Sequence, residues 1–189
     1  NAQPAILTHS VATLRVIQAR APQIVPVFVA GHSMGEFGAL VAAGALSFED
    51  GVRLVRERGR LMKQAGQTQP GGMAAIMNLS RDVLDEVCRE ASDTIGQPVQ
   101  VANDNSPGQI VLSGDVAALD KAMELAKARG AKRAIKLAVS IAAHSQLMKP
   151  AANAFRSALD ATSFTTPIVA VVGNVYARPV ELIDIRDEL

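Results

Sequence analysis

The stretch Val29–Leu40 reads VAGHSMGEFGAL and places Ser33 where an apolar run gives way to a helical pattern. The preceding segment, IVPVFVA (24–30), is apolar and rich in β-branched residues, as strands are. The residues that follow repeat apolar side chains at the spacing of a helix. We therefore predict that Ser33 lies on a sharp turn from a strand into a helix.

A G-x-S-x-G sequence on such a turn is typical of a nucleophile elbow. Gly31 and Gly35 are expected to remove side chains that would clash where the backbone turns. The turn then presents the Ser33 hydroxyl at a helix N-terminus, where the backbone N–H of Met34 is best placed to stabilise an oxyanion. The alternative is a tight turn of small residues with no chemical role. The flanking strand and helix favour the nucleophile.

The composition predicts a globular protein, because 189 residues with 49% hydrophobic content can build one sizeable core and a small attached subdomain. The net charge is +1, and the basic residues are interspersed with acids, so no basic tract indicates nucleic acid or a membrane surface. The single cysteine, Cys88, leaves no internal disulfide and is expected to be packed in a helix. The histidines and this thiol lack the spacing of a metal site, and nothing indicates a cofactor.

No apolar run is long enough to span a bilayer, and no signal sequence is recognisable, so we expect a cytoplasmic protein. The chain begins at Asn1 rather than at a methionine and opens directly into a helical pattern. We therefore expect an internal piece of a longer protein.

Before the turn, residues 5–20 carry apolar side chains at helical spacing and predict a helix that ends near Pro22. After the helix that follows Ser33, the sequence SFED predicts a second helix start, with Ser47 as the N-cap and Asp50 three residues later. That helix is expected to run to about Ala65, before GQTQPGG breaks the pattern.

From residue 72 the pattern changes and predicts strand, helix, strand, strand, helix, strand. This order is that of a ferredoxin-like βαββαβ unit, and we expect such a subdomain at 72–138. Residues 140–159 are then expected to be mostly helical, and IVAVVGNV (168–175) to be a strand. The remaining parts, 1–71 and 139–189, are expected to form an α/β core with a parallel sheet.

A serine hydroxyl needs a general base, most often a histidine. His144 is the best candidate, because it follows a strand and a short loop and is expected to begin a helix at the rim of a sheet. His32 adjoins Ser33, and consecutive side chains on a tight turn point apart. His9 lies within the first helix. The alternative for His144 is a residue that only helps to cap a helix.

Arg58 lies at the centre of the apolar stripe of the helix that begins after Ser47, whereas Arg53, Arg56, Glu57, Arg60 and Lys63 fall on its far side. An unpaired guanidinium would be costly there, so it must meet a carboxylate or carbonyl groups. The partner is either a protein carboxylate such as Glu36 or the carboxylate of a substrate, which matches the planar fork of arginine. The residues alone leave both open.

Five motifs occur in order along the whole chain, and through them it closely resembles the malonyl-CoA:acyl-carrier-protein transacylases, part of the acyltransferase family of fatty acid and polyketide synthesis. They are GHSMGE (31–36), ERGRLM (57–62), NSPGQIVLSG (105–114), GAKRAIKLAVS (130–140) and HSQLMKPAA (144–152). The resemblance implies an α/β-hydrolase-like core with an inserted ferredoxin-like subdomain. It also implies that malonyl-CoA and acyl carrier protein are the substrate and partner; the charge pattern above indicates no nucleic acid and no membrane.

By this resemblance, Ser33 accepts the malonyl group as an ester, His144 activates Ser33 and then protonates the departing thiol, and Arg58 pairs with the malonyl carboxylate. The N–H of Met34 matches one oxyanion donor of the family. The second donor, a glutamine in a Gly-Gln-Gly segment, is absent from this sequence, as is the C-terminal part of the family fold. Asn103 and Asn105 match a polar loop near the family site.

Three other functions compete with this interpretation. Related polyketide-synthase acyltransferases select malonyl or methylmalonyl groups with the residues before the base histidine, here Ile141, Ala142 and Ala143, which match neither usual signature. A serine hydrolase would share the elbow and use water as acceptor, but would have no use for Arg58. A non-catalytic module that docks acyl carrier protein would not need both Ser33 and His144.

Overall fold

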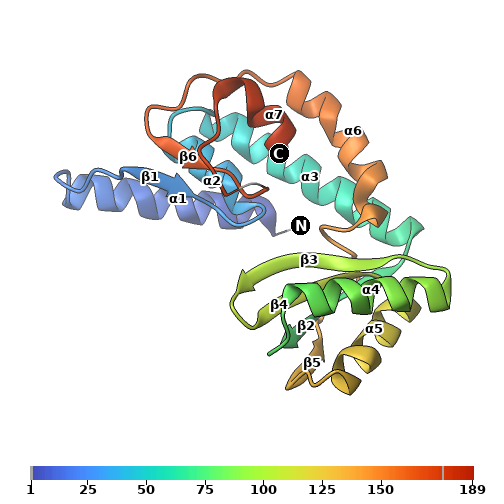
Figure 1. Cartoon of the computed structure of the whole chain (residues 1–189). Coiled ribbons are helices and arrows are strands. Elements are labelled where there is room, and N and C mark those ends of the chain that lie inside the picture. Colours follow the sequence, from blue (N-terminus) through green and yellow to red (C-terminus); the bar gives the residue numbers. More distant parts are fainter. Residues whose placement is uncertain (1, 176) are drawn as a thin grey trace. The chain divides into compact units, whose positions relative to one another are not determined.

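A computed structural model, which describes residues 2–175 and 177–189, divides the chain into two units (Figure 1). Unit 1 comprises Asn1–Arg60 and Ala154–Leu189, and unit 2 comprises Leu61–Asn153. Helix α3, Phe48–Thr68, begins in unit 1 and continues into unit 2, and α6, Lys149–Asp160, leads back. Unit 2 is therefore inserted into the sequence of unit 1.

Unit 1 is built on a parallel pair of strands, β1 (Phe28–Ala30) and β6 (Ala170–Val172), in which Ala30 is opposite Val172. Its other elements are α1 (Gln3–Arg20), α2 (Gly35–Ala42), η2 (Leu182–Asp184) and α7 (Ile185–Glu188), with the unit's parts of α3 and α6. Phe37 of α2 is 1% exposed and meets Phe155 of α6 edge-on, with ring centroids 6.1 Å apart. This aromatic contact packs α2 against α6.

Strand β1 is shorter than the sequence predicts. The expected strand over 24–30 pairs only from Phe28 onward, and Ile24, Val25 and Val27 are more than 60% exposed. A strand exists only where a neighbouring backbone accepts and donates hydrogen bonds, and Pro26 has no N–H to donate. The apolar pattern correctly predicts a strand in this segment, but the strand forms only over Phe28–Ala30, where it pairs with β6.

The predicted first helix is confirmed as α1, but its buried face differs from the apolar spacing used to find it. Leu7 and Val11 are buried, whereas Ile6 and Ile17 are 50% and 45% exposed. The helix pattern therefore predicts the element correctly, and only tertiary contacts select which of its apolar side chains is covered.

The predicted start of α3 is confirmed. Ser47 precedes Phe48, and its Oγ accepts a hydrogen bond from the Asp50 N–H at 3.0 Å. The Ser47 hydroxyl in turn donates to the Asp50 carboxylate at 2.8 Å. The helix runs to Thr68, about one turn beyond the expected end near Ala65.

Unit 2 contains a four-stranded antiparallel sheet with two helices on one face (Figure 1). The elements follow in the order β2 (Gly71–Met77), α4 (Arg81–Ile95), β3 (Val99–Ser106), β4 (Gln109–Asp115), α5 (Val116–Ala128) and β5 (Arg133–Lys136). The strand order across the sheet is β3-β4-β2-β5. The predicted sequence of strands and helices is thus confirmed in this region.

The two faces of the unit 2 sheet have different roles. One face and both helices form a core whose buried members include Ile76, Leu84, Cys88, Leu112 and Leu119. The other face carries Met73 and Val111, which pack with Ala143 and the partly buried Ile141. The second face of the sheet therefore supports the loop that leads to His144.

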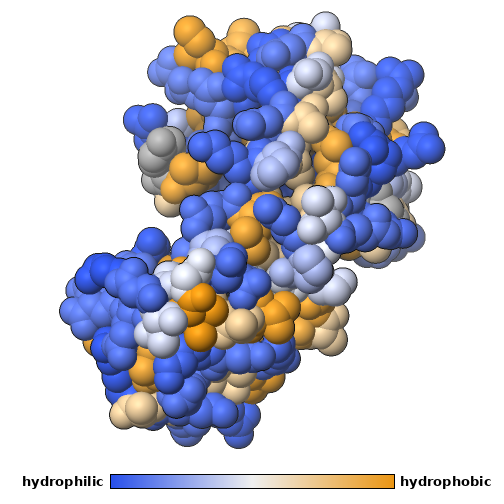
Figure 2. Space-filling view, turned by 90° about the vertical axis from the view of Figure 1, so that its right-hand side faces the viewer, coloured by the Kyte–Doolittle hydropathy of each residue, from blue (hydrophilic) through white to orange (hydrophobic). Residues whose placement is uncertain are grey.

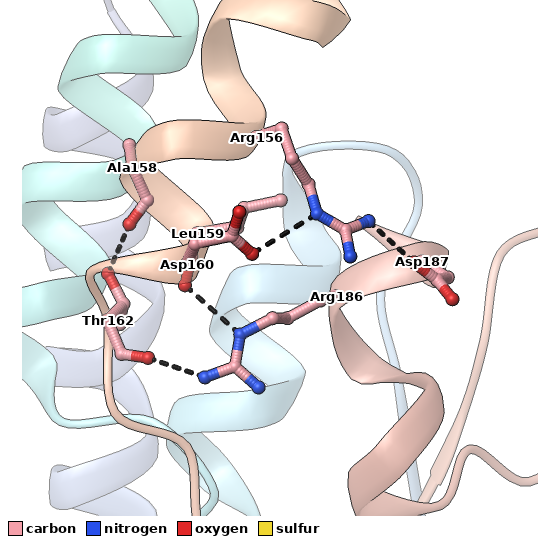
Figure 3. Close-up of polar contacts among 7 residues, drawn as sticks. All are labelled: Arg156, Ala158, Leu159, Asp160, Thr162, Arg186 and Asp187. Carbon is pink, nitrogen blue, oxygen red and sulfur yellow. Dashed lines mark hydrogen bonds and ion pairs between the residues drawn. The ribbon is translucent and has the colours of Figure 1, made fainter.

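Two arginines, Arg186 of α7 and Arg156 of α6, link the C-terminal helix of unit 1 to the end of α6 (Figure 3). Arg186 donates from Nε to the Leu159 carbonyl at 3.2 Å and from Nη2 to the Thr162 carbonyl at 2.9 Å. Arg156 forms ion pairs with Asp160 and Asp187. Because the last carbonyls of a helix have no partner within the helix, a cation there satisfies them and complements the helix dipole.

The face drawn in Figure 2 is mainly hydrophilic, with hydrophobic residues gathered in patches. Among residues 2–175 and 177–189, none of the helices has the length and apolar content that a bilayer crossing requires.

Candidate active site

Ser33 lies on the turn between β1 and α2, as the sequence predicts. Its backbone is left-handed, with φ at +53°, which is unusual for a residue other than glycine. The Gly35 N–H donates to the His32 carbonyl at 2.9 Å, and the Glu36 N–H donates to the Ser33 carbonyl at 3.1 Å. A tight hydrogen-bonded turn thus holds Ser33 in a strained conformation at the start of α2.

The two glycines around Ser33 are not equivalent. A Cβ added to Gly31 would lie 2.0 Å from the backbone C and O of Gly35, so the turn can close only because Gly31 has no side chain. Beyond its chain neighbours and the backbone of its own helix, a Cβ added to Gly35 would meet no described atom within 4 Å. The expectation that both glycines avoid a clash is therefore correct for Gly31 and wrong for Gly35, because Gly35 contributes the backbone that Gly31 approaches.

Arg58 reaches the nucleophile from α3. Its Nη2 donates to the Ser33 Oγ at 3.0 Å, and its Nη1 donates to the Gln3 side-chain oxygen at 3.0 Å. Burial lowers the pKa of the Arg58 guanidinium, and the nearby Glu36 carboxylate partly opposes that shift. In the part of the chain that the structure describes, no carboxylate forms an ion pair with Arg58, so the alternative of a salt bridge to Glu36 is not what the geometry contains.

Glu36 and Asn174 contact the backbone of Ser33. Asn174 accepts a hydrogen bond on Oδ1 from the Ser33 N–H at 2.7 Å, and its own N–H donates to the Glu36 Oε1 at 3.1 Å. Glu36 is 5% exposed, and burial raises the pKa of its carboxyl from 4.5 to about 7. Glu188 raises this pKa further, whereas the Asn174 N–H and Arg58 lower it.

His144 belongs to unit 2 and lies in a loop with φ at +57°. The expectation that it begins a helix is wrong: a left-handed residue cannot start a right-handed helix, and the 3-10 helix η1 begins at Gln146 (Gln146–Met148). The N-cap of η1 is Ser145, whose Oγ accepts from the Leu147 N–H at 3.3 Å and donates to the Ala142 carbonyl at 2.7 Å.

Gln100 of β3 also contacts the His144 loop. Its Oε1 accepts from the Gln146 N–H at 3.0 Å, and its Nε2 donates to the His144 carbonyl at 3.5 Å. One amide side chain therefore bonds to the backbone on both sides of Ser145, and this constrains a loop whose conformation is strained at His144.

The other sequence candidates occupy varied positions. Met34 is the N-cap of α2, with φ at −57° and ψ at −26°. His32 and His9 are exposed. Asn103 lies in β3 opposite Val111 of β4 and is partly buried, and Asn105 is exposed. Within the described part of the chain, no group of three or more His, Cys, Asp or Glu side chains could hold a metal ion.

The structure brings Ser33, Met34 and Arg58 together in unit 1, and it places His144 with Gln100 in unit 2. Sequence reasoning missed Asn174, Gln3 and Gln100 as neighbours of these residues. A signal existed for Asn174: it lies near the carboxyl end of the strand predicted over 168–175, and polar residues at the ends of parallel strands meet at the carboxyl edge of the sheet. For Gln3 and Gln100, no pattern in the sequence distinguishes them from surface glutamines.

Comparisons with protein families, curated proteins and solved structures agree on one family. The family described as acyl transferase domain matches residues 1–186. The malonyl CoA-acyl carrier protein transacylase of Bacillus subtilis is 48% identical over 190 residues, which cover 100% of this chain and 59% of that protein.

Solved structures agree with the sequence comparison. The transacylase of the same name from Coxiella burnetii superposes with a TM-score of 0.94 at 41% identity, covering 98% of this chain and 58% of that one. A malonyl-transacylase solved in complex with a type II PKS acyl-carrier protein gives a TM-score of 0.93 at 42% identity, covering 98% and 60%. The chain thus spans about three fifths of the length of these relatives.

Proposed function

This chain belongs to the acyl transferase domain family, and we propose that the protein carrying it moves a malonyl group from coenzyme A to the thiol of acyl carrier protein. The reaction serves fatty acid biosynthesis and runs through an ester on Ser33. The observation that carries the proposal is the 3.0 Å hydrogen bond from the Arg58 guanidinium to the Ser33 Oγ on a strained strand-to-helix turn. A nucleophile and a carboxylate-binding cation are adjacent there.

In this proposal Ser33 is the nucleophile and His144 the general base. The Ser33 Oγ attacks the thioester carbonyl while its proton passes to His144, and the tetrahedral intermediate collapses as the coenzyme A sulfur leaves with that proton. The thiol of acyl carrier protein then attacks the seryl ester in the reverse sense. The N–H of Met34, at the N-cap of α2, stabilises the oxyanion in both steps.

Arg58 selects the acyl group. Malonyl carries a free carboxylate, and the planar guanidinium can bind it through two parallel hydrogen bonds. Because Arg58 is partly buried and forms no ion pair with a carboxylate of the described chain, an acetyl group would leave its charge without a counterion. The site therefore favours a dicarboxylic acyl group.

The finer fold assignment is part of the same proposal. Residues 1–71 and 139–189 form an α/β-hydrolase-like catalytic core, supported by the parallel β1–β6 pair and the turn at its carboxyl edge. Residues 72–138 form a ferredoxin-like subdomain, supported by the strand order β3-β4-β2-β5. A cytoplasmic location is supported by the single cysteine, Cys88, which is buried as a free thiol.

A polyketide-type acyltransferase is the second candidate. The structural neighbour solved with a type II PKS acyl-carrier protein favours it, because that protein has the same fold over 98% of this chain. In that case Ile141, Ala142 and Ala143 help to set the choice between malonyl and methylmalonyl. Ala142 and Ala143 are buried, and Ile141 packs beside them on the face of the sheet that supports the His144 loop.

Intact-mass analysis of the natural protein that carries this chain tests the proposal. After brief exposure to malonyl-CoA, we expect a malonyl adduct on Ser33 that acyl carrier protein discharges, and none on the Ser33→Ala variant. Parallel incubations with acetyl-CoA and methylmalonyl-CoA measure the acyl preference. Release of malonate and coenzyme A without transfer would establish hydrolysis instead, and a Ser33→Ala protein that still transfers would establish that Ser33 is not the nucleophile.

Replacement of Arg58 tests the selectivity. We expect Arg58→Ala to slow malonyl transfer by about 100-fold, as loss of a charged hydrogen-bond pair implies, while acetyl transfer is unchanged or faster. Arg53→Ala is the matched control, because Arg53 lies on the same helix with a side chain that is 77% exposed and pairs with Asp50. Equal loss for both acyl groups would show that Arg58 is structural.

A further inference from the structure

The topology of unit 1 brings Asn174 beside Ser33, the proposed nucleophile. Strands β1 and β6 are parallel and in register, so the residues that follow them leave the sheet at the same edge. Ser33 lies three residues after Ala30, and Asn174 lies two residues after Val172, its register partner. The two segments are 141 residues apart in sequence and meet through the 2.7 Å hydrogen bond from the Ser33 N–H to the Asn174 Oδ1.

Three hydrogen bonds close a ring at this edge. The Ser33 N–H donates to Asn174, the Asn174 N–H donates to the Glu36 carboxyl, and the Glu36 N–H donates to the Ser33 carbonyl. Glu36 is buried at the start of α2, so its carboxyl can move little. Both backbone polar groups of Ser33 are therefore hydrogen-bonded within this ring, which the buried Glu36 anchors.

This ring of hydrogen bonds stabilises the left-handed backbone conformation of Ser33. A non-glycine residue in the left-handed region is disfavoured by about 1 kcal/mol or more, and it persists only where the surroundings hold it. Arg58 contacts the hydroxyl of Ser33, whereas Asn174 contacts its backbone. The two residues thus constrain different degrees of freedom of the same nucleophile.

We propose that Asn174 is a positioning residue, which holds Ser33 in its reactive backbone conformation through its side-chain oxygen, while Glu36 holds Asn174. An amide suits this role, because its oxygen accepts the Ser33 N–H without placing a negative charge beside the position where the oxyanion develops. The proposal rests on Ser33 being the nucleophile, as stated in the proposed function.

The test measures the Ser33 backbone and its reactivity separately. In Asn174→Ala, we expect amide hydrogen exchange at Ser33 to accelerate, because its acceptor is lost. We also expect the rate of malonyl-enzyme formation to fall about 10-fold or more with KM for malonyl-CoA unchanged, since a small displacement of a nucleophile is costly. If Asn174 were merely structural, the variant would have a lower melting temperature. It would not slow malonyl-enzyme formation while leaving the KM for malonyl-CoA unchanged.

Two further variants complete the experiment. Val175→Ala is the matched control in the same segment, because its side chain is exposed; we expect exchange and acylation at the original rates. Asn174→Asp keeps the size and the acceptor oxygen and serves where the alanine variant does not fold. It should retain protection of the Ser33 amide.

The outcomes separate this inference from the proposed function. Unchanged Ser33 exchange and unchanged acylation in Asn174→Ala would overturn the positioning role, as would loss of Ser33 protection in Asn174→Asp. Labelling of Ser33 by a fluorophosphonate, which needs no acyl-CoA, is measured in parallel. If the unsubstituted protein reacts with this reagent at Ser33 but accepts no malonyl group, the proposed function fails; the positioning role then stands or falls on the exchange and labelling rates alone.

Discussion

Gly31 shows how one absent side chain determines whether the elbow can form. The backbone of Gly35 occupies the space where a Cβ at Gly31 would lie, and backbone cannot move aside as a flexible side chain can. A Cβ at Gly35 would contact no described atom beyond its chain neighbours and its own helix, and the φ of Gly35 is not positive. The two glycines of the motif therefore have separable roles.

We expect Gly31→Ala to lower the free energy of unfolding by at least about 2 kcal/mol, because the turn must open to admit the methyl group. Gly35→Ala should leave it unchanged or raise it by up to about 1 kcal/mol, since alanine is the better helix former at the first residue of α2. Urea denaturation of the two variants measures both values. Similar losses in both would contradict the assignment of the clash to Gly31 alone.

Glu36 makes stability depend on pH near neutrality. Burial raises its pKa from 4.5 to about 7 in the folded protein, with Glu188 adding to the shift and Arg58 opposing it. The folded state therefore binds the proton more tightly than the unfolded state, and this contribution to stability is complete below pH 4.5 and is lost as the pH rises through about 7.

Glu36→Gln tests this dependence, because it removes the titration and keeps a side-chain oxygen for the Asn174 N–H. Between pH 4.5 and 7 we expect the stability of the unsubstituted protein to fall relative to the variant by up to about 3 kcal/mol. Denaturation midpoints at a series of pH values measure the difference. Parallel curves for the two proteins over this range would show that Glu36 does not titrate there.

At the scale of elements, periodicity located helices α1 to α6 and the strands of the antiparallel sheet, and it failed where an element depends on a distant partner. The segment 24–27 has the composition of a strand but no register partner. Residues 140–159 were expected to be mostly helical with His144 beginning a helix; they are helical from Gln146, whereas Ser145 and Gln100 hold an irregular loop before it. Both failures arise from hydrogen bonds that the local pattern does not contain.

Gln100 offers a test of how β3 holds the His144 loop. In Gln100→Ala we expect amide exchange at Gln146 to accelerate about 5-fold, which corresponds to about 1 kcal/mol for one lost hydrogen bond. Gln109→Ala is the control, because Gln109 is an exposed residue of the neighbouring strand β4. Unchanged exchange at Gln146 would show that Ser145 alone is enough to hold the loop.

At the scale of the whole molecule, the reactivity of the single cysteine, Cys88, measures whether the core of unit 2 is folded. Cys88 is 4% exposed among the helices and strands of that core, and burial raises the pKa of its thiol to about 12, with Asp85 adding to the shift. The thiolate is the reactive form, so the folded protein protects this residue both by access and by charge state.

We therefore expect thiol reagents to modify Cys88 at pH 8 only through unfolding of unit 2. The labelling rate should rise with urea and approach the rate of a free thiol at urea concentrations above the unfolding transition, which far-UV circular dichroism detects. Cys88→Ala provides the background rate. Rapid labelling of the folded protein, at a rate close to that in high urea, would contradict a packed thiol.

Much of the candidate site was accessible to sequence reasoning because its residues carry local signals. Ser33 is marked by the glycines and by the change from strand to helix, and Arg58 by being the charged residue on an apolar stripe. His144 was selected by its place after a strand, although its local conformation was not foreseen. The roles of Ser33, Met34, Arg58 and His144 remain predictions that the variants above test.

The sequence by itself determined the order of helices and strands, the turn at Ser33 and the family, because these depend on side-chain periodicity and on motifs within a few residues. Only the tertiary structure decided that Arg58 meets the Ser33 hydroxyl and Gln3, that Asn174 meets the Ser33 N–H, and which apolar side chains of α1 are covered. Those contacts join segments 25, 55 and 141 residues apart. Hydrogen bonds and burial act over a few ångströms in space, so the parallel register of β1 and β6 and the packing of the helices, rather than proximity in the chain, select the partners.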